Sequence, residues 1–143
     1  MTTAPITTGT TETLSVVVER EIPFAPEKIW RALTQPHLIE AWLMKNDFVP
    51  AIGHRFKLAG DWGSVDCEVT ELEPNRSLAY TWTAMGLATL LQFSLTPTAA
   101  GTHLRIEQSG FPTEPATDRY FTGAQWGWRK FTAALDEVLA GLD

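Results

Sequence analysis

The feature that most limits how this chain can fold is a series of short β-strand patterns followed by one long amphipathic helix pattern. Apolar and polar residues alternate in six segments, at 47–51, 54–59, 64–73, 77–84, 88–96 and 102–109. The links between them are short and contain Gly, Pro and Asn, as in an antiparallel meander. A sheet with one apolar face needs a cover for that face, and the C-terminal helix is the only predicted element long enough.

Alternation within the strands assigns each side chain to one face of the sheet. The predicted inner face consists of Phe56, Leu58, Val65, Cys67, Val69, Leu78, Tyr80, Trp82, Leu91, Phe93, Leu95, Leu104 and Ile106. The opposite face carries charged and hydroxyl-bearing residues, which is typical of a sheet with one solvated face.

The covering helix is expected to begin between Pro115 and Asp118 and to end near Leu139. A helix turns by about 100° per residue, so residues that share a face can be read from the sequence. Its apolar stripe consists of Tyr120, Phe121, Ala124, Trp128, Phe131, Leu135, Val138, Leu139 and Leu142.

Two tryptophans of this helix, Trp126 and Trp128, are too close in sequence to share a face. Trp128 belongs to the apolar stripe, and Trp126 lies about 160° from it on the same geometry. Trp126 is therefore expected to face outward, as a partner surface or over a neighbouring loop. A kink at Gly123 or Gly127 is the alternative that would turn Trp126 inward.

The N-terminal part predicts one strand followed by two short helices. Residues 13–22 alternate in polarity, except that Arg20 lies on the apolar side of the strand. Pro26 and Pro36 each stand where a first helical turn would begin, which favours a helix–break–helix over one continuous helix. Together with the sheet and the long helix, this order predicts an α+β fold.

Composition and charge exclude several classes of protein. The net charge is −6, and no run of Lys or Arg suggests a nucleic-acid partner. The single cysteine, Cys67, excludes an internal disulfide and a Cys-based zinc cluster. The sequence contains no bilayer-length apolar stretch and no secretory signal, so we expect no membrane insertion and a cytoplasmic location. Residues 1–11 are expected to be a disordered tail before a single domain at 12–143.

The order of elements, and several stretches of sequence, resemble a known family. These stretches are VVVEREIPFAPEKIWRALTQPHLIEAW, FVPAIGHRFKL, SLAYTW, THLRIEQSGF and GWRKFTAALDEVL. The chain resembles the START-like, or helix-grip, superfamily over roughly residues 13–141. Within that superfamily it is similar to the homologues of the heat-shock protein 90 ATPase activator (the AHSA type).

The resemblance implies a curved antiparallel sheet of six to seven strands that wraps around the C-terminal helix and encloses an elongated cavity. Members of the superfamily bind lipids, sterols, polyketides or other apolar small molecules, and some are cyclases or dehydratases. The namesake domain assists a chaperone. Fold alone does not choose among these activities, and the family has no shared catalytic residue set to transfer.

The residues themselves give no sign of a metal centre or a nucleophile. His37, His54 and His103 fall on different predicted elements and are not expected to converge on a metal ion. Cys67 is expected to be an inert buried thiol, because it faces the apolar interior with no adjacent histidine. The sequence implies no cofactor and no catalytic set.

Aromatic residues supply the first candidates for a ligand site. Trp82, Phe93 and Trp128 are predicted at the interface of sheet and helix, with Phe131 on the same helical stripe. Such side chains either fill a core or line an apolar cavity. The leading hypothesis is a binding module that encloses a small hydrophobic or aromatic molecule among them.

Polar residues on the predicted inner faces supply the other candidates. Arg20, Tyr80 and Gln108 all fall among apolar neighbours. Arg20 either pairs with a local carboxylate at the sheet edge or meets an acidic ligand group. Gln108 either orients a polar ligand atom or bridges its strand to the following loop.

Two alternatives follow from these polar and exposed residues. An enzyme of the cyclase or dehydratase kind would need two of Tyr80, Gln108 and Arg20 to converge in an open pocket. A protein-interaction module would use the exposed Trp62 and Trp126 as its surface, and a homodimer through them is a milder version.

Overall fold

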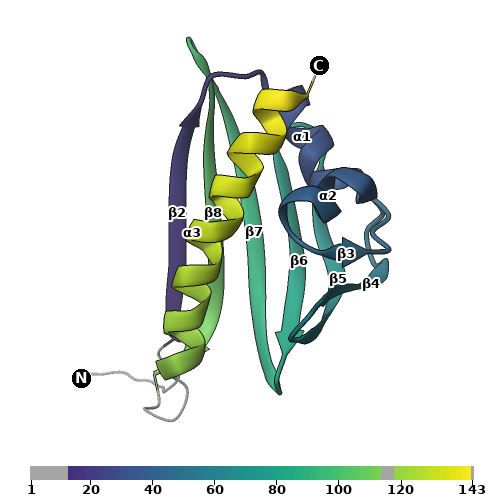
Figure 1. Ribbon diagram of the computed structural model, residues 1–143, viewed down its shortest axis with the longest axis vertical. Coiled ribbons are helices and arrows are strands. Elements are labelled where there is room, and N and C mark those ends of the chain that lie inside the picture. Colours follow the sequence, from purple (N-terminus) through teal and green to yellow (C-terminus); the bar gives the residue numbers. More distant parts are fainter. Residues whose placement is uncertain (1–12, 114–117, 143) are drawn as a thin grey trace, which may run out of the picture.

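The computed structural model describes residues 13–113 and 118–142. Within these residues, one layer is a seven-stranded antiparallel sheet and the other is formed by three helices (Figure 1). The strands are β2 (Thr13–Ile22), β3 (Lys45–Asn46), β4 (Arg55–Gly60), β5 (Gly63–Glu73), β6 (Ser77–Ala84), β7 (Leu87–Thr98) and β8 (Gly101–Pro112). The helices are α1 (Pro26–Thr34), α2 (Pro36–Trp42) and α3 (Asp118–Gly141). This is the predicted α+β helix-grip fold.

The sheet order is β2-β8-β7-β6-β5-β4-β3, so the first strand lies beside the last one and the others form a meander. The inward alternation predicted from the sequence is confirmed for β4 to β8, where the apolar set is buried except for Trp82, which is half-buried. Figure 1 shows α3 crossing one face of the sheet, with α1 and α2 on that same face.

One predicted strand, at 47–51, is wrong. The chain forms only the two-residue strand β3 before it, and the segment itself is irregular. The side chain of Asn46 accepts a hydrogen bond from the backbone N–H of Phe48 at 3.1 Å, which closes a local turn. Asp47 then accepts the N–H of Lys57 at 2.8 Å through its carboxylate. Side-chain hydrogen bonds therefore replace the ladder that an extended strand would have made.

Irregularities in two strand pairs accompany the twist of the sheet. The register shifts between Val69 and Glu71 of β5, and between Leu14 and Ser15 opposite β8. At the second shift Gly110 is the extra residue of β8 and has a φ of +99°. Such bulges bend a strand and reverse which residues point inward.

The two short helices begin at their prolines, as predicted. Pro26 and Pro36 stand in the first turns of α1 and α2, where the missing N–H leaves no helical bond unmade. The indole N–H of Trp42 donates to the carbonyl of Ala32 at 2.8 Å, which fixes α2 against α1. The ring of Trp42 then packs edge-on against Phe93 of β7, with 6.3 Å between ring centroids.

Helix α3 covers the sheet with the predicted stripe. Trp128, Leu135 and Leu139 are buried, whereas Trp126 is 67% exposed. The outward orientation expected for Trp126 is therefore confirmed. The expected tail at 1–11 lies outside the described residues. Among the described helices, none has the length and apolar character needed to cross a membrane.

Candidate ligand-binding site

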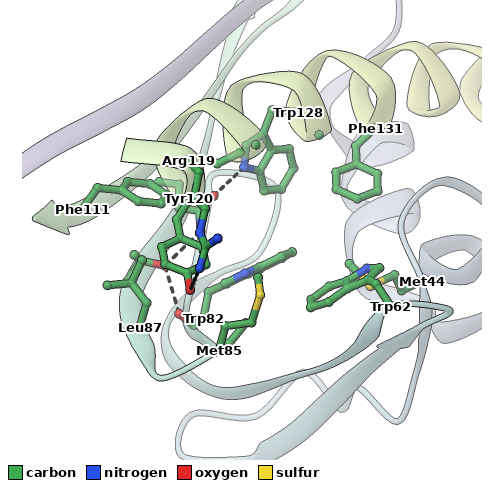
Figure 2. A pocket seen from close by; sticks show the side chains of 16 residues that line it. Met44, Trp62, Trp82, Met85, Leu87, Phe111, Arg119, Tyr120, Trp128 and Phe131 are labelled. Atoms are coloured by element: carbon green, nitrogen blue, oxygen red, sulfur yellow. Dashed lines mark hydrogen bonds between the residues drawn. The ribbon is translucent and has the colours of Figure 1, made fainter. Parts of the chain in front are cut away.

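A cavity of about 290 Å³ lies between the first half of α3 and the sheet. Figure 2 shows Trp128 and Phe131 projecting from α3 toward Trp82 and Trp62 on the opposite side. The lining residues are Met44, Trp62, Trp82, Ala84, Met85, Leu87, Thr89, Gln108, Phe111, Arg119, Tyr120, Gly123, Ala124, Gly127, Trp128 and Phe131. The lining is mostly apolar and aromatic, with a few polar groups, as is usual for small-molecule sites.

The space exists because α3 carries small residues where it faces this part of the sheet. Gly123, Ala124 and Gly127 all line the cavity and present at most a methyl group. A Cβ atom added at Gly123 would meet nothing within 4 Å, and one at Gly127 would meet only Phe131, at 3.5 Å. The helix therefore holds its backbone away from the sheet without filling the gap.

Aromatic rings form the inner walls of the cavity. The rings of Trp82 and Trp128 are inclined by 54° with centroids 5.8 Å apart. Phe131 packs edge-on against Trp128 at 5.5 Å. These contacts fix the ring planes, so the walls are rigid surfaces against which a flat apolar molecule can pack.

A chain of buried hydrogen bonds fixes the polar wall of the cavity. The indole N–H of Trp128 donates to Oε1 of Gln108 at 2.6 Å, and Nε2 of Gln108 donates to the hydroxyl of Thr89 at 2.9 Å. The Thr89 hydroxyl donates in turn to the carbonyl of Trp82 at 2.9 Å. Because an indole can only donate, the orientation of the Gln108 amide is determined. Its Nε2, which has two hydrogens, faces Thr89.

Two hairpin tips form the mouth of the cavity. Trp62, in the β4–β5 tip, is 53% exposed, and Met85, in the β6–β7 tip, is 65% exposed. Met85 and Gly86 both have positive φ, as the two-residue turn between Ala84 and Leu87 requires. Both side chains line the cavity while remaining accessible to solvent.

The first turn of α3 brings one charge to the cavity. Arg119 is the single charged side chain in the lining, among the residues that the structure describes. Its guanidinium carbon lies 5.2 Å from the centre of the Tyr120 ring, and Nη2 donates weakly to the Tyr120 hydroxyl at 3.4 Å. Arg119 is exposed, so its charge stays solvated beside the opening.

Four of the seven candidate residues from the sequence line the cavity. Trp82, Gln108, Trp128 and Phe131 all contribute to its surface. Phe93 does not: it is 1% exposed and lies in the packed interior, with its ring 6.3 Å from that of Trp128. Of the expected trio Trp82, Phe93 and Trp128, only the two tryptophans line the cavity, and Phe93 packs behind Trp128.

Tyr80 and Arg20 lie outside the cavity lining. The Tyr80 ring packs edge-on against Phe56 at 5.0 Å, and burial raises the pKa of its hydroxyl well above 10.0. Arg20 forms an ion pair with Asp136 of α3, and both side chains are partly exposed. Of the two interpretations of Arg20, pairing with a local carboxylate is the one that the geometry bears out.

Several lining residues were not recognised as site candidates from the sequence, although some of them follow a sequence pattern that indicates an inward orientation. Thr89 lies two residues before the inward-facing Leu91 of β7, so the two side chains share a face of the sheet. Phe111 faces inward because the bulge at Gly110 shifts the alternation, and a glycine inside a strand pattern is a recognised sign of a bulge. Tyr120 was already on the predicted apolar stripe of the helix, whereas Met44 and Arg119 gave no comparable signal, because their place at the cavity depends on tertiary packing.

Other titratable groups lie away from the cavity. Burial raises the pKa of the Cys67 thiol from 9.0 to about 12, with Asp66 and Asp47 adding to the shift. On the outer face, hydrogen bonds to Glu21 and Glu19 raise the pKa of His103 above 6.5. Within residues 13–113 and 118–142, no three side chains of His, Cys, Asp or Glu are grouped so that they could hold a metal ion.

Several solved structures are similar to this chain. Protein MLL2253 from Mesorhizobium loti is 53% identical, with 91% of this chain and 99% of that one aligned and a TM-score of 0.86. Protein BH1534 from Bacillus halodurans is 25% identical, with 91% and 99% aligned and a TM-score of 0.77. CalU16 from Micromonospora echinospora is 20% identical, with 90% and 76% aligned and a TM-score of 0.77, and so shares the fold.

No curated protein matches the sequence of this chain. The family described as "Activator of Hsp90 ATPase homolog 1-like protein" matches residues 23–140, which is most of the sequence. The match covers both short helices, six of the strands and nearly all of α3. The resemblance noted in the sequence is thus confirmed, and the chain belongs to the activator of Hsp90 ATPase homolog 1-like family.

Proposed function

We propose that this protein binds a small hydrophobic or aromatic molecule in the cavity between the sheet and the first half of α3. The single observation that carries the proposal is the cavity of about 290 Å³, walled by Trp82, Trp128 and Phe131. Burial of a flat apolar molecule there would remove aromatic surface from water on both sides of it. The role is sensing, carriage or sequestration rather than turnover.

The placement of the polar candidates argues against the enzyme alternative. Carbonyl polarisation by two of Tyr80, Gln108 and Arg20 requires both groups to reach one ligand atom. Of these three, only Gln108 lines the cavity. Tyr80 packs against Phe56, and Arg20 is paired with Asp136. A binding role needs only the walls and one orienting amide.

The binding proposal can be tested by filling the cavity from α3. Gly127 lines the space, and a Cβ atom added there meets only the Phe131 ring, at 3.5 Å. In Gly127→Leu, the leucine occupies the volume that a ligand would need. Leucine also favours a helix over glycine by up to about 1 kcal/mol, so we expect the fold to be retained.

The measurement is quenching of tryptophan fluorescence by naphthalene, indole and quinoline, with thermal unfolding measured in parallel. We expect saturable quenching in the parent protein and at least about tenfold weaker binding in Gly127→Leu, with an unchanged or raised Tm. Trp126→Ala, on the solvent face of α3, is the matched control and should bind as the parent does. Equal binding by the parent and Gly127→Leu would place the ligand elsewhere and refute the proposal.

A further inference from the structure

The polar groups that the cavity offers to a ligand are mainly donors. One hydrogen of Gln108 Nε2 is used by Thr89, and among the described residues the other has no protein acceptor. The indole N–H of Trp82, a half-buried residue, likewise has none within residues 13–113 and 118–142. The two potential acceptors here already take one hydrogen bond each, since Gln108 Oε1 accepts from Trp128 and the Thr89 hydroxyl accepts from Gln108, although each oxygen has a second lone pair. The unpaired N–H groups therefore favour acceptor atoms on a ligand over additional donors.

The buried position of Gln108 makes this preference strong at the inner wall. The residue is only 3% exposed. A buried N–H without an acceptor is costly, so a ligand oxygen that accepts it gains more than the same contact would at the surface.

A charged acceptor belongs at the mouth rather than at this inner wall. A carboxylate buried against Gln108 would lose its hydration without meeting a cation, which is far more costly than burying a neutral oxygen. Arg119 supplies a cation beside the opening, and no acidic side chain lines the cavity among the described residues. The Tyr120 ring below the guanidinium holds it at the first turn of α3.

We infer that the ligand is an aromatic acid. Its ring system packs against the wall formed by Trp82, Trp128 and Phe131, and its carboxylate meets the guanidinium of Arg119 at the mouth. A neutral acceptor on the ring, such as a carbonyl or ether oxygen, can reach the Gln108 amide. This inference rests on the proposed function and adds the chemical class of its ligand.

The carboxylate makes the prediction selective between two nearly isosteric probes. We would titrate the protein with 2-naphthoate and with 2-naphthamide by isothermal titration calorimetry at pH 7, where the acid is ionised. The two probes share the ring system and differ mainly in charge. We expect 2-naphthoate to bind about five- to tenfold more tightly, because a charge-assisted contact at a solvated site adds a moderate gain. Raising the salt concentration should reduce this advantage.

Two arginines of α3 provide a matched pair of variants. Arg119→Gln removes the cation at the mouth, and Arg129→Gln makes the same change in net charge on the exposed face, where Arg129 lies 5.6 Å from the Trp126 ring. We expect Arg119→Gln to bind both probes equally and Arg129→Gln to keep the preference for the acid. Thermal unfolding of both variants confirms that they are folded.

Each outcome decides a different point. Equal binding of the two probes by the parent protein, or a preference for the acid that survives in Arg119→Gln, would refute the acid and leave the cavity as a site for neutral aromatics. Tighter binding of the amide by the parent would have the same meaning. Binding of neither probe would contradict the inference. If naphthalene also failed to quench the tryptophan fluorescence, the proposed function would be contradicted too.

Discussion

The two halves of α3 meet the sheet in different ways. In the second half, Leu135 and Leu139 are 0% and 1% exposed and fill the space to the strands. In the first half, Gly123, Ala124 and Gly127 leave that space open, and the cavity lies there. One helix thus supplies a packed core along part of its length and a binding wall along the rest.

This site exists because the first half of α3 carries small residues where it faces the sheet. A helix of uniform apolar residues would have closed the gap along its whole length, as protein interiors normally do. Glycine in a helix costs about 1 kcal/mol relative to alanine, so Gly123 and Gly127 lower the helical stability of the first half of α3. The packed half compensates by anchoring the helix to the sheet.

The largest effect we expect comes from opening the packed half. Leu135→Ala removes a fully buried side chain and leaves a cavity behind, which should lower the free energy of unfolding by about 2–5 kcal/mol. The measurement is urea unfolding followed by tryptophan fluorescence. Gly127→Ala, in the open half, is the contrasting variant and should be neutral or stabilising, because the new methyl group meets only the edge of Phe131.

Similar changes in the free energy of unfolding in the two variants would contradict a difference in packing between the two halves of α3. A loss below about 1 kcal/mol in Leu135→Ala would mean that the second half is not tightly packed against the sheet. A large loss in Gly127→Ala would mean that the first half has no spare room, and the cavity could not accept a ligand.

The same contrast is repeated along β6. Trp82 is half-buried and lines the cavity, whereas Tyr80, which points inward from the same strand, is 3% exposed. Near Tyr80, burial and the neighbouring Asp66 and Asp47 raise the pKa of the Cys67 thiol to about 12. The hydroxyl of Tyr80 also has a raised pKa because it is buried.

These pKa shifts predict a loss of stability in alkali. The unfolded thiol releases its proton at its ordinary pKa of 9.0, whereas the folded one keeps it until about pH 12. The unfolded state therefore gains on the folded state as the pH rises, so the stabilisation is complete below pH 9 and is lost between pH 9 and 12. Tyr80 adds to the loss above its ordinary pKa of 10.0.

The measurement is the free energy of unfolding between pH 8 and pH 11, for the parent and for Cys67→Ala. We expect a steeper decline in the parent than in the variant, even though the variant is less stable at neutral pH. We also expect the native thiol to be unreactive toward a thiol reagent at pH 8. Rapid labelling of the folded protein would show that this part of the interior is not closed.

Much of the fold was predictable because its patterns are local. The alternation of β4 to β8 and the prolines at 26 and 36 fixed element type and orientation, and helical geometry placed Trp126 and Trp128 on opposite sides. The error at 47–51 arose from Asn46 and Asp47, whose side-chain hydrogen bonds compete with a strand ladder. The alternation of apolar and polar residues alone does not reveal that competition.

The site was less predictable because it depends on distance across the interior. Trp82, Gln108, Trp128 and Phe131 were found, since each lies on a face that points inward. Phe93 has the same pattern as Trp82, and only tertiary packing distinguishes the filled position from the open one. The pairing of Arg20 with Asp136 of α3 also joins elements distant in sequence.

The smallest effect we expect is on the outer side of α3, where Trp126→Ala removes a ring that is 67% exposed. The ring of Trp126 contacts the guanidinium of Arg129, and exposed contacts of this kind contribute about 0.5–1 kcal/mol at most. The free energy of unfolding should therefore change by less than about 1 kcal/mol, while Trp128→Ala should lose several times as much. Analytical ultracentrifugation of the parent and of Trp126→Ala extends the test, because a change in sedimentation would identify this face as a contact between copies of the chain. An unchanged oligomeric state and unchanged stability would leave the inner side of the helix as the one that carries both the core and the cavity.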